Sequence, residues 1–190
     1  LENVNIDGSR ETQTEIKGTT SREDGGRHCL AIRGECENIF IRNCTFTNSA
    51  ADGLCLFPIG AAASYAVRNV VISDSVFTDN RRHGISADKV NGLTLVRCKL
   101  NSNGLTKTVG FPDNHGNTGD KFGGLFYGNG IDIEEYTSTD GSKNVWLIAC
   151  EGTGNARGGV LILRTSDAMA STEFGFYHIL GGSYKKGLYS

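Results

Sequence analysis

The most acidic stretch of the chain is NGIDIEE, residues 129–135, which holds three carboxylates within four positions. Asp132 and Glu134 alternate with Ile131 and Ile133, and this period of two predicts a β-strand with both acids on one face. Cleavage of a glycosidic bond by hydrolysis requires two carboxylic groups beside the bond, one protonated and one ionised. The strand is therefore the first candidate for a catalytic site.

Two other segments share its Gly-apolar-x-apolar pattern, ADGLCLF (51–57) and HGISAD (83–88). When the three glycines are aligned, Asp52, His83 and Asp88 join the face of Asp132 and Glu134. Asp88 and Glu134 then lie on adjacent strands, with backbones about 5 Å apart. Asp52 and Asp132 lie two strands apart, near 10 Å by the same spacing. A carboxyl separation of about 5 Å is typical of a covalent intermediate, and about 6.5–9.5 Å leaves room for an attacking water.

Basic and aromatic residues flank these five candidate catalytic residues. The arginines are Arg81, Arg82, Arg157 and Arg164. Of these, Arg82 and Arg157 are predicted to bind an anionic sugar, with Phe122 and Tyr127 as an apolar platform for its rings. His83 could act as an acid, a base or a charge neutraliser.

Two other interpretations of the acidic face stay open. It could be an ordinary solvated face with ion pairs between strands, or a calcium site, because Ca²⁺ takes oxygen ligands. The GGxGxDxUx nonapeptide of calcium-binding β-rolls is absent. We therefore predict no cofactor, with Ca²⁺ as the alternative.

The strands that must position this face belong to an internal repeat. Its frame is Asn-apolar-x-apolar-x-x-Cys-x-Phe, a short polar turn, then Gly-apolar-x-apolar. Copies occupy 37–57, 68–88, 91–104 completed by 129–135, and 143–163, and 184–190 repeats the second half. The aligned glycines are Gly53, Gly84, Gly130, Gly159 and Gly187. Self-similarity at such a period indicates stacked structural repeats.

The half-copies are short, alternate with period two and are rich in Val, Ile, Phe and Thr, which favours strands. The sequence predicts an all-β fold, a right-handed parallel β-helix of about five rungs with two long loop insertions. Cys44, Ser75, Cys98 and Cys150 are expected to form one inward column. An up-and-down sandwich is the alternative, but it gives no reason for such a column.

The 190 residues are expected to form a single domain with loop insertions at 7–27 and 105–128. A third, shorter loop is expected at 165–176. At the start of the chain, Asn3, Val4 and Ile6 match the Asn-apolar-x-apolar half of a rung. Neither end shows a cap, so the chain is expected to be a segment of a longer protein, or a domain that a partner caps.

Composition excludes some classes of partner. The net charge of −2 gives no electrostatic case for binding nucleic acid or an anionic membrane surface, and no apolar run is long enough to span a bilayer. The six cysteines include no C-x-x-C and no His/Cys grouping at zinc spacing. They are predicted to be free, buried thiols, which leaves the redox compartment open.

The rung pattern resembles the pectin-lyase-like superfamily of right-handed parallel β-helices, which includes pectate lyases, polygalacturonases, alginate epimerases and phage tailspikes. ADGL at 51–54 and RHGIS at 82–86 are similar to the NTDGI and GHGIS motifs of polygalacturonases. This resemblance implies a catalytic carboxylate at Asp52 and an assisting histidine at His83. The chain departs from the pattern because no Asp-Asp pair lies between the two motifs and no Arg-Ile-Lys follows them. RRHGISADKV (81–90) also resembles a rung of alginate epimerases, without their Asp-Pro-His motif.

The opening IDG with its arginine, together with DGL and GIDIE, looks like β-helix proteins of phage tails and secreted bacterial proteins. We therefore expect an extracellular or virion-associated protein that cleaves or modifies acidic glycans as a glycoside hydrolase or lyase. The alternative is a non-catalytic glycan-binding or structural segment of a tailspike or cell-surface protein. A polysaccharide is the expected partner, and a homotrimer or flanking domains of the same chain are further partners that the resemblance allows.

Overall fold

The computed structural model describes residues 1–9, 27–58, 67–104, 128–134, 142–162 and 174–177. Throughout this part of the chain the regular elements are β-strands, and it contains no helix. No described segment is therefore a helix that could cross a membrane.

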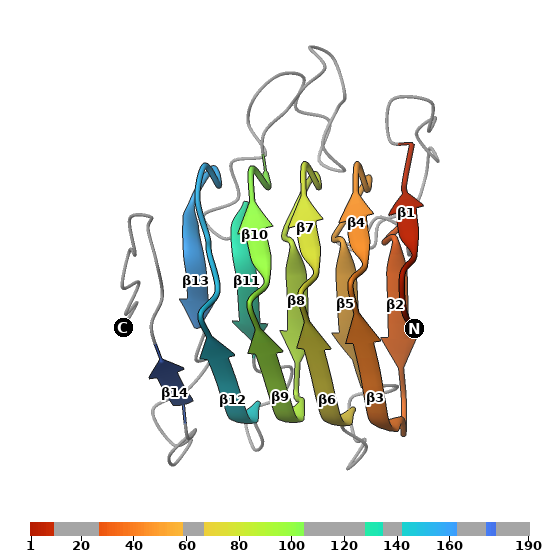
Figure 1. The fold of residues 1–190 in the computed structure, drawn as a ribbon, viewed down its shortest axis with the longest axis vertical. Coiled ribbons are helices and arrows are strands. Elements are labelled where there is room, and N and C mark those ends of the chain that lie inside the picture. The colour runs from red at the N-terminus through yellow and green to blue at the C-terminus, as the bar shows by residue number, and fades with distance from the viewer. Residues whose placement is uncertain (10–26, 59–66, 105–127, 135–141, 163–173, 178–190) are drawn as a thin grey trace.

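The strands form three parallel sheets, and Figure 1 shows the strands of each sheet side by side, with the second sheet behind the other two. The first sheet contains, in spatial order, β1 (Asn5–Asp7), β4 (Thr45–Thr47), β7 (Val76–Thr78) and β10 (Lys99–Asn101). The second contains β2 (Leu30–Arg33), β5 (Leu54–Phe57), β8 (Ile85–Asp88), β11 (Asn129–Glu134) and β13 (Gly158–Ile162). The third contains β3 (Glu37–Arg42), β6 (Arg68–Ser73), β9 (Asn91–Val96), β12 (Lys143–Ile148) and β14 (Phe174–Tyr177).

The sequence repeat determines which strands pair. Equivalent strands of successive copies are neighbours in each sheet, and all of these pairs are parallel. Phe46 pairs with Phe77, and Leu54 with Ile85, as the aligned copies require. The predicted register is confirmed for the described copies, and the antiparallel sandwich is wrong.

One hydrophobic core receives side chains from all three sheets. The column of Cys44, Ser75, Cys98 and Cys150 is buried as predicted, and the Cys44 amide donates a hydrogen bond to Ser75 Oγ at 3.1 Å. Next to it, the rings of Phe46 and Phe77 stack with centroids 4.8 Å apart. All six cysteines are free thiols, and the predicted burial is confirmed for four of them. It is wrong for Cys29 and Cys36, which are partly exposed.

A ladder of side chains runs along the bend between the first and second sheets. It consists of Ser49, Asn80, Asn103 and Asn155. The side-chain oxygen Oδ1 of Asn80 accepts a hydrogen bond from the Ser49 backbone amide at 3.1 Å, while Asn80 Nδ2 donates to the Phe46 backbone carbonyl at 3.3 Å. Asn103 repeats both bonds one copy later. These bonds satisfy backbone groups that the bend removes from the sheets.

The aligned glycines lie beside this ladder. Glycine is required at these positions because there is no space for a side chain. A Cβ added at Gly84 would lie 2.5 Å from the Gly130 carbonyl oxygen, and one at Gly53 would lie 2.7 Å from the Gly84 carbonyl oxygen and from Asn80 Nδ2. Immediately before β2, Cys29 occupies the position equivalent to Gly53. The ladder residue that faces Cys29 is Ser49, which is shorter than the asparagines of later copies.

Three boundaries differ from the sequence prediction. Asn3 bonds to Asn43 and β1 pairs with β4, so the first residues match the Cys-x-Phe part of the repeat rather than the Asn-apolar-x-apolar half. The two parts are alike because each begins with an asparagine at positive φ, such as Asn38 and Asn43. β1 extends to Asp7, the first residue of the predicted 7–27 insertion, and β14 lies partly within the predicted loop at 165–176.

Candidate functional site

The candidate site lies on the second sheet, on the side away from the core. In β11, Ile131 and Ile133 join the core, so alternation turns Asp132 to the opposite side. The register gives Asp132 the row Cys55, Ser86, Asp132 and Leu161. We expected this row on an open outer face, but Asp132 is fully buried and the other three are at most 8 % exposed. Alternation separates the two sides of a sheet without showing whether the second side is covered.

Asp88 and Glu134 are in-register partners on β8 and β11, as the sequence predicts. The Asp88 side chain is buried. Glu134 is described as part of the strand, but its side chain lies outside the described residues. The predicted carboxylate pair is therefore placed by its backbone.

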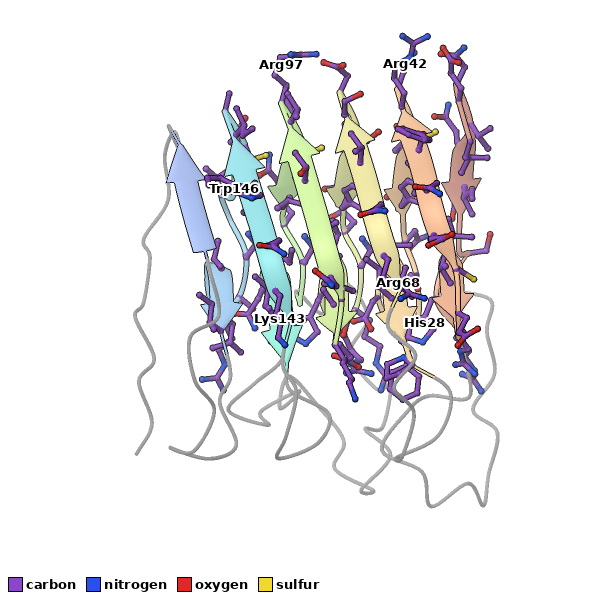
Figure 2. All side chains as sticks on the ribbon, turned by 90° about the horizontal axis from the view of Figure 1, so that it is seen from below. His28, Arg42, Arg68, Arg97, Lys143 and Trp146 are labelled. Atoms are coloured by element: carbon purple, nitrogen blue, oxygen red, sulfur yellow. The ribbon has the colours of Figure 1, made fainter. Side chains whose placement is uncertain are left out.

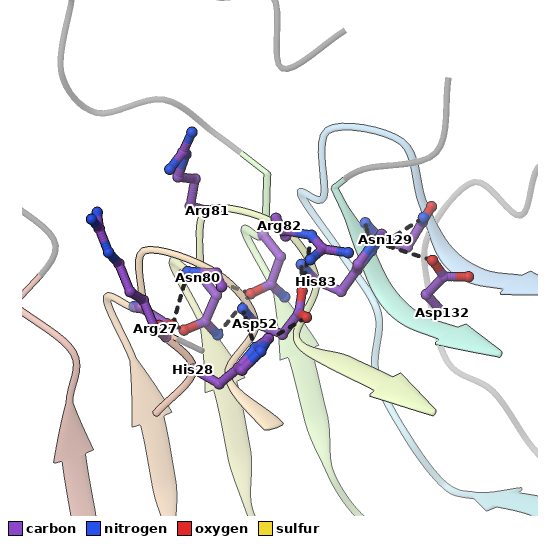
Figure 3. Close-up of polar contacts among 12 residues, drawn as sticks. Arg27, His28, Asp52, Asn80, Arg81, Arg82, His83, Asn129 and Asp132 are labelled. Atoms are coloured by element: carbon purple, nitrogen blue, oxygen red, sulfur yellow. Dashed lines mark hydrogen bonds and ion pairs between the residues drawn. The ribbon is translucent and has the colours of Figure 1, made fainter. Parts of the chain in front are cut away.

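A second row of polar residues lies at the start of these strands. It contains His28, Asp52, His83 and Asn129, each two residues before a core residue of β2, β5, β8 or β11 (Figure 3). Sequence analysis missed His28, because Cys29 follows it where the other copies have glycine. The match of HCLAIR to DGLCLF would have revealed it.

Asp52 is the acceptor at the centre of this row. Its Oδ1 accepts the His83 backbone amide at 2.9 Å and lies 3.7 Å from Arg82 Nε, while its Oδ2 lies 3.3 Å from His28 Nδ1. Burial alone would raise the pKa of Asp52. The charge of Arg82 and the contact with His28 outweigh it and hold that pKa below its usual range, so Asp52 is ionised.

His28 Nδ1 also faces the backbone amide of Asp52 at 3.3 Å. One ring nitrogen cannot donate and accept at once. When Nδ1 carries a proton it donates to Oδ2 of Asp52, and when it does not, it accepts from the Asp52 amide.

His83 joins the two rows. Its Nδ1 accepts the Asn129 backbone amide at 3.2 Å, and its Nε2 lies 3.1 Å from Asp132 Oδ2, both side chains being buried (Figure 3). Burial lowers the pKa of His83 to about 3, opposed by Asp52 and assisted by Arg82. The ring is therefore neutral near pH 7, and because Nδ1 accepts a hydrogen bond, its proton lies on Nε2, which faces Asp132 Oδ2.

The remaining predicted site residues have different positions. Arg82 is mostly buried beside Asp52, Arg81 is buried and donates to the Ala50 carbonyl, and Arg157 is half-buried with its amide bonded to the Gly128 carbonyl. Figure 3 shows Arg81 and Arg82 on the same turn as His83. Phe122, Tyr127, Arg164 and nearly all of the 105–128 insertion lie outside the described residues.

One group within the described residues has the donors to hold a metal ion. The ligand atoms of His28, Asp52 and Cys55 all lie within 4.8 Å of one another. A search for zinc spacing in the sequence could not find it, since its members come from β5 and from the turns before β2 and β5.

The chain matches no protein-family model, no curated protein and no solved structure.

Proposed function

We propose that the protein is a right-handed parallel β-helix of the pectin-lyase-like kind that cleaves or modifies an acidic polysaccharide. The strand order, the all-parallel pairing and the single core shared by three sheets support the fold. The grouping of Asp88, Asp132 and His83 on one sheet, with Glu134 in register, supports the chemistry.

The observation that carries the proposal is the burial of ionisable groups on a side of the sheet that contributes nothing to the core. Asp52, His83, Asp88 and Asp132 are each at most 5 % exposed. Removing a charged group from water costs several kcal/mol even when it is paired. Groups perturbed in this way concentrate at functional sites.

The proposed roles follow from position. Asp88 and Glu134, one strand apart, would serve as the carboxyl pair, one donating a proton to the glycosidic oxygen and the other acting at the anomeric carbon. His83 Nε2 lies 3.1 Å from Asp132 Oδ2, and Asp132 would be the alternative general base. Arg157, half-buried near the ends of these strands, would bind a sugar carboxylate. Asp52 would act as a positioning residue for Arg82 and His83.

The proposal is tested by a screen of acidic polysaccharides that records both new reducing ends and the absorbance of unsaturated products. Reducing ends alone identify a hydrolase, and both signals together identify a lyase. On the substrate found, at least one of Asp88→Asn, Asp132→Asn and Glu134→Gln should lower turnover by about 10²–10⁴-fold, the usual contribution of a general acid or base.

The matched control is Asp74→Asn, which removes an exposed carboxylate bonded to Arg97 at the bend between β6 and β7, outside the second sheet. This variant should retain full activity. Melting curves of all four variants establish that they are folded. Full activity of every site variant would place the chemistry elsewhere, and the absence of any product would reject an enzyme that cleaves the polysaccharide.

A second candidate, a non-catalytic glycan-binding or structural segment, is favoured by one observation. Phe40 and Trp146 lie in one register row of the third sheet, separated by Val71 and Thr94, and both aromatic side chains are exposed (Figure 2 labels Trp146). Their strands are three steps apart, about 14 Å, and exposed rings in such a row can stack on sugars. Glycan binding that survives the site variants but is lost in Trp146→Ala would favour this candidate. An extracellular or virion-associated location, and a trimer of such chains, belong to both proposals.

A further inference from the structure

The turn before β2 and the start of β5 bring together a histidine, a carboxylate and a thiol. His28 Nδ1 lies 3.3 Å from Asp52 Oδ2, and Cys55 Sγ completes a group whose three ligand atoms are all within 4.8 Å. The side chains of His28 and Asp52 are 3 % and 1 % exposed, and Cys55 is buried. Nitrogen, oxygen and sulfur donors in a closed space are the usual ligands of Zn²⁺.

We propose that His28, Asp52 and Cys55 bind a thiolate-preferring divalent transition-metal ion, with Zn²⁺ as its reference. Tetrahedral Zn²⁺ with bonds of about 2.0–2.3 Å places its ligand atoms about 3.3–3.8 Å apart. The widest separation in the existing group therefore needs to contract by about 1–1.5 Å. Three protein ligands leave a fourth position for water or for an oxygen of a bound molecule. Ca²⁺ is excluded from this group because it takes oxygen ligands.

The surroundings of Asp52 support a metal rather than only a His–Asp pair. Oδ1 is already occupied by the His83 amide and by Arg82, which fixes the plane of the carboxylate. Oδ2 is buried and, among the described residues, makes no hydrogen bond of normal geometry, although His28 Nδ1 is close. Outer contacts that orient one oxygen and leave the other for the ion are typical of metal sites.

The charges around Cys55 also favour the binding of a cation. Burial raises the pKa of the Cys55 thiol, and the carboxylates of Asp52 and Asp88 raise it further. The same two negative charges attract a divalent cation, and a bound cation in turn deprotonates the coordinating thiol. The positive charge of Arg82 opposes the binding of a cation. Arg82 faces Asp52 Oδ1, however, and not Oδ2, the oxygen proposed to bind the ion.

The test is a titration of the intact, chelator-stripped chain with Co²⁺, followed by displacement with Zn²⁺. We expect one Co²⁺ per chain, a thiolate-to-cobalt absorption band and intense visible bands of tetrahedral cobalt. Cys55→Ser should abolish the thiolate band and weaken the binding of Co²⁺ about 100-fold or more. This effect exceeds the one expected from losing a residue that only contacts a ligand of the metal. Ser86 is the in-register neighbour of Cys55, which shows that serine fits this row.

Cys36→Ser is the matched control, because Cys36 Sγ faces the Arg33 carbonyl and lies outside the group. His28→Gln provides a second ligand variant if Cys55→Ser does not fold. The proposal is overturned if wild type binds no stoichiometric Co²⁺, if the band survives Cys55→Ser or His28→Gln, or if Cys36→Ser removes it. The readout does not involve glycans, so its failure and a failure of the proposed enzyme are separate results.

Discussion

At the scale of single residues, the surroundings of His83 determine its own charge state. Its Nδ1 accepts a hydrogen bond from the Asn129 backbone amide, and its Nε2 lies 3.1 Å from Asp132 Oδ2. A protonated ring could not accept at Nδ1, so both the hydrogen bonds and the burial favour the neutral form.

This arrangement predicts a loss of stability in acid. The folded pKa of His83 is lowered to about 3, whereas an unfolded histidine titrates near 6.5. Between these values the unfolded chain binds the extra proton. Stability is therefore full above pH 6.5 and should fall as the pH decreases towards 3, with a slope of up to about 1.4 kcal/mol per pH unit. Asp52, whose pKa is also lowered, adds to the loss below its ordinary value of 3.8.

Urea unfolding of the metal-free chain between pH 8 and about pH 4 measures this effect. The variant His83→Gln keeps a polar side chain but cannot titrate, so its stability should change less over the upper part of this range. Equal pH dependence in wild type and variant would mean that His83 is not held neutral by the fold.

At the scale of elements, the repeat predicted which strands pair, and alternation predicted their core residues. Phe46, Phe77 and the column of Cys44, Ser75, Cys98 and Cys150 were recognisable because period two and the repeat agree. The covering of the Asp132 row was not predictable, since nothing in a strand's own pattern records what packs on its second side. His28 was missed because one glycine of the repeat is replaced by Cys29.

The aligned glycines, such as Gly84, give a prediction about the stability of the stacked strands. Gly84→Ala should destabilise the chain by about 1–3 kcal/mol or more, because the new methyl group meets the backbone of Gly130 rather than a side chain that can move. Chemical unfolding with an unchanged m-value would measure it.

Gly92→Asn is the control for this prediction. Gly92 has φ +84°, but the equivalent places hold Asn38, Asn69 and Asn144 at φ 52–60°. Asparagine tolerates this region, so the control should change stability by about 0.5 kcal/mol or less. A cost at Gly92 as large as that at Gly84 would show that backbone conformation, and not space, selects these glycines.

At the scale of the whole molecule, each strand depends on its immediate neighbours in the sheet. The first, second and third sheets all add their strands in chain order, so contacts join one copy to the next (Figure 1). Stability in such an array is close to a sum of nearest-neighbour terms. The all-β arrangement of parallel strands was predictable from the repeat, whereas the contacts of the candidate site were not, because they depend on side chains that separate copies contribute.

Amide hydrogen exchange should therefore follow position in the sheet. β8 has β5 on one side and β11 on the other, whereas β2 has only β5 among the described strands. We expect the amides of Ile85–Asp88 to exchange at least about tenfold more slowly than those of Leu30–Arg33, because β2 can open without disturbing a second neighbour. Equal protection of the two strands would indicate that the whole array opens in one cooperative step.

The pairing of Cys29 with Ser49 has a consequence for how such chains vary. Where the ladder residue is Asn80 or Asn103, its amide fills the space beside Gly53 or Gly84, and where it is the shorter Ser49, the facing position admits Cys29. The two positions form an epistatic pair. Substitutions there should covary among related sequences, Gly with Asn and a larger residue with Ser. A mixed pair, such as Cys29 facing an asparagine, would be selected against although either residue alone is acceptable.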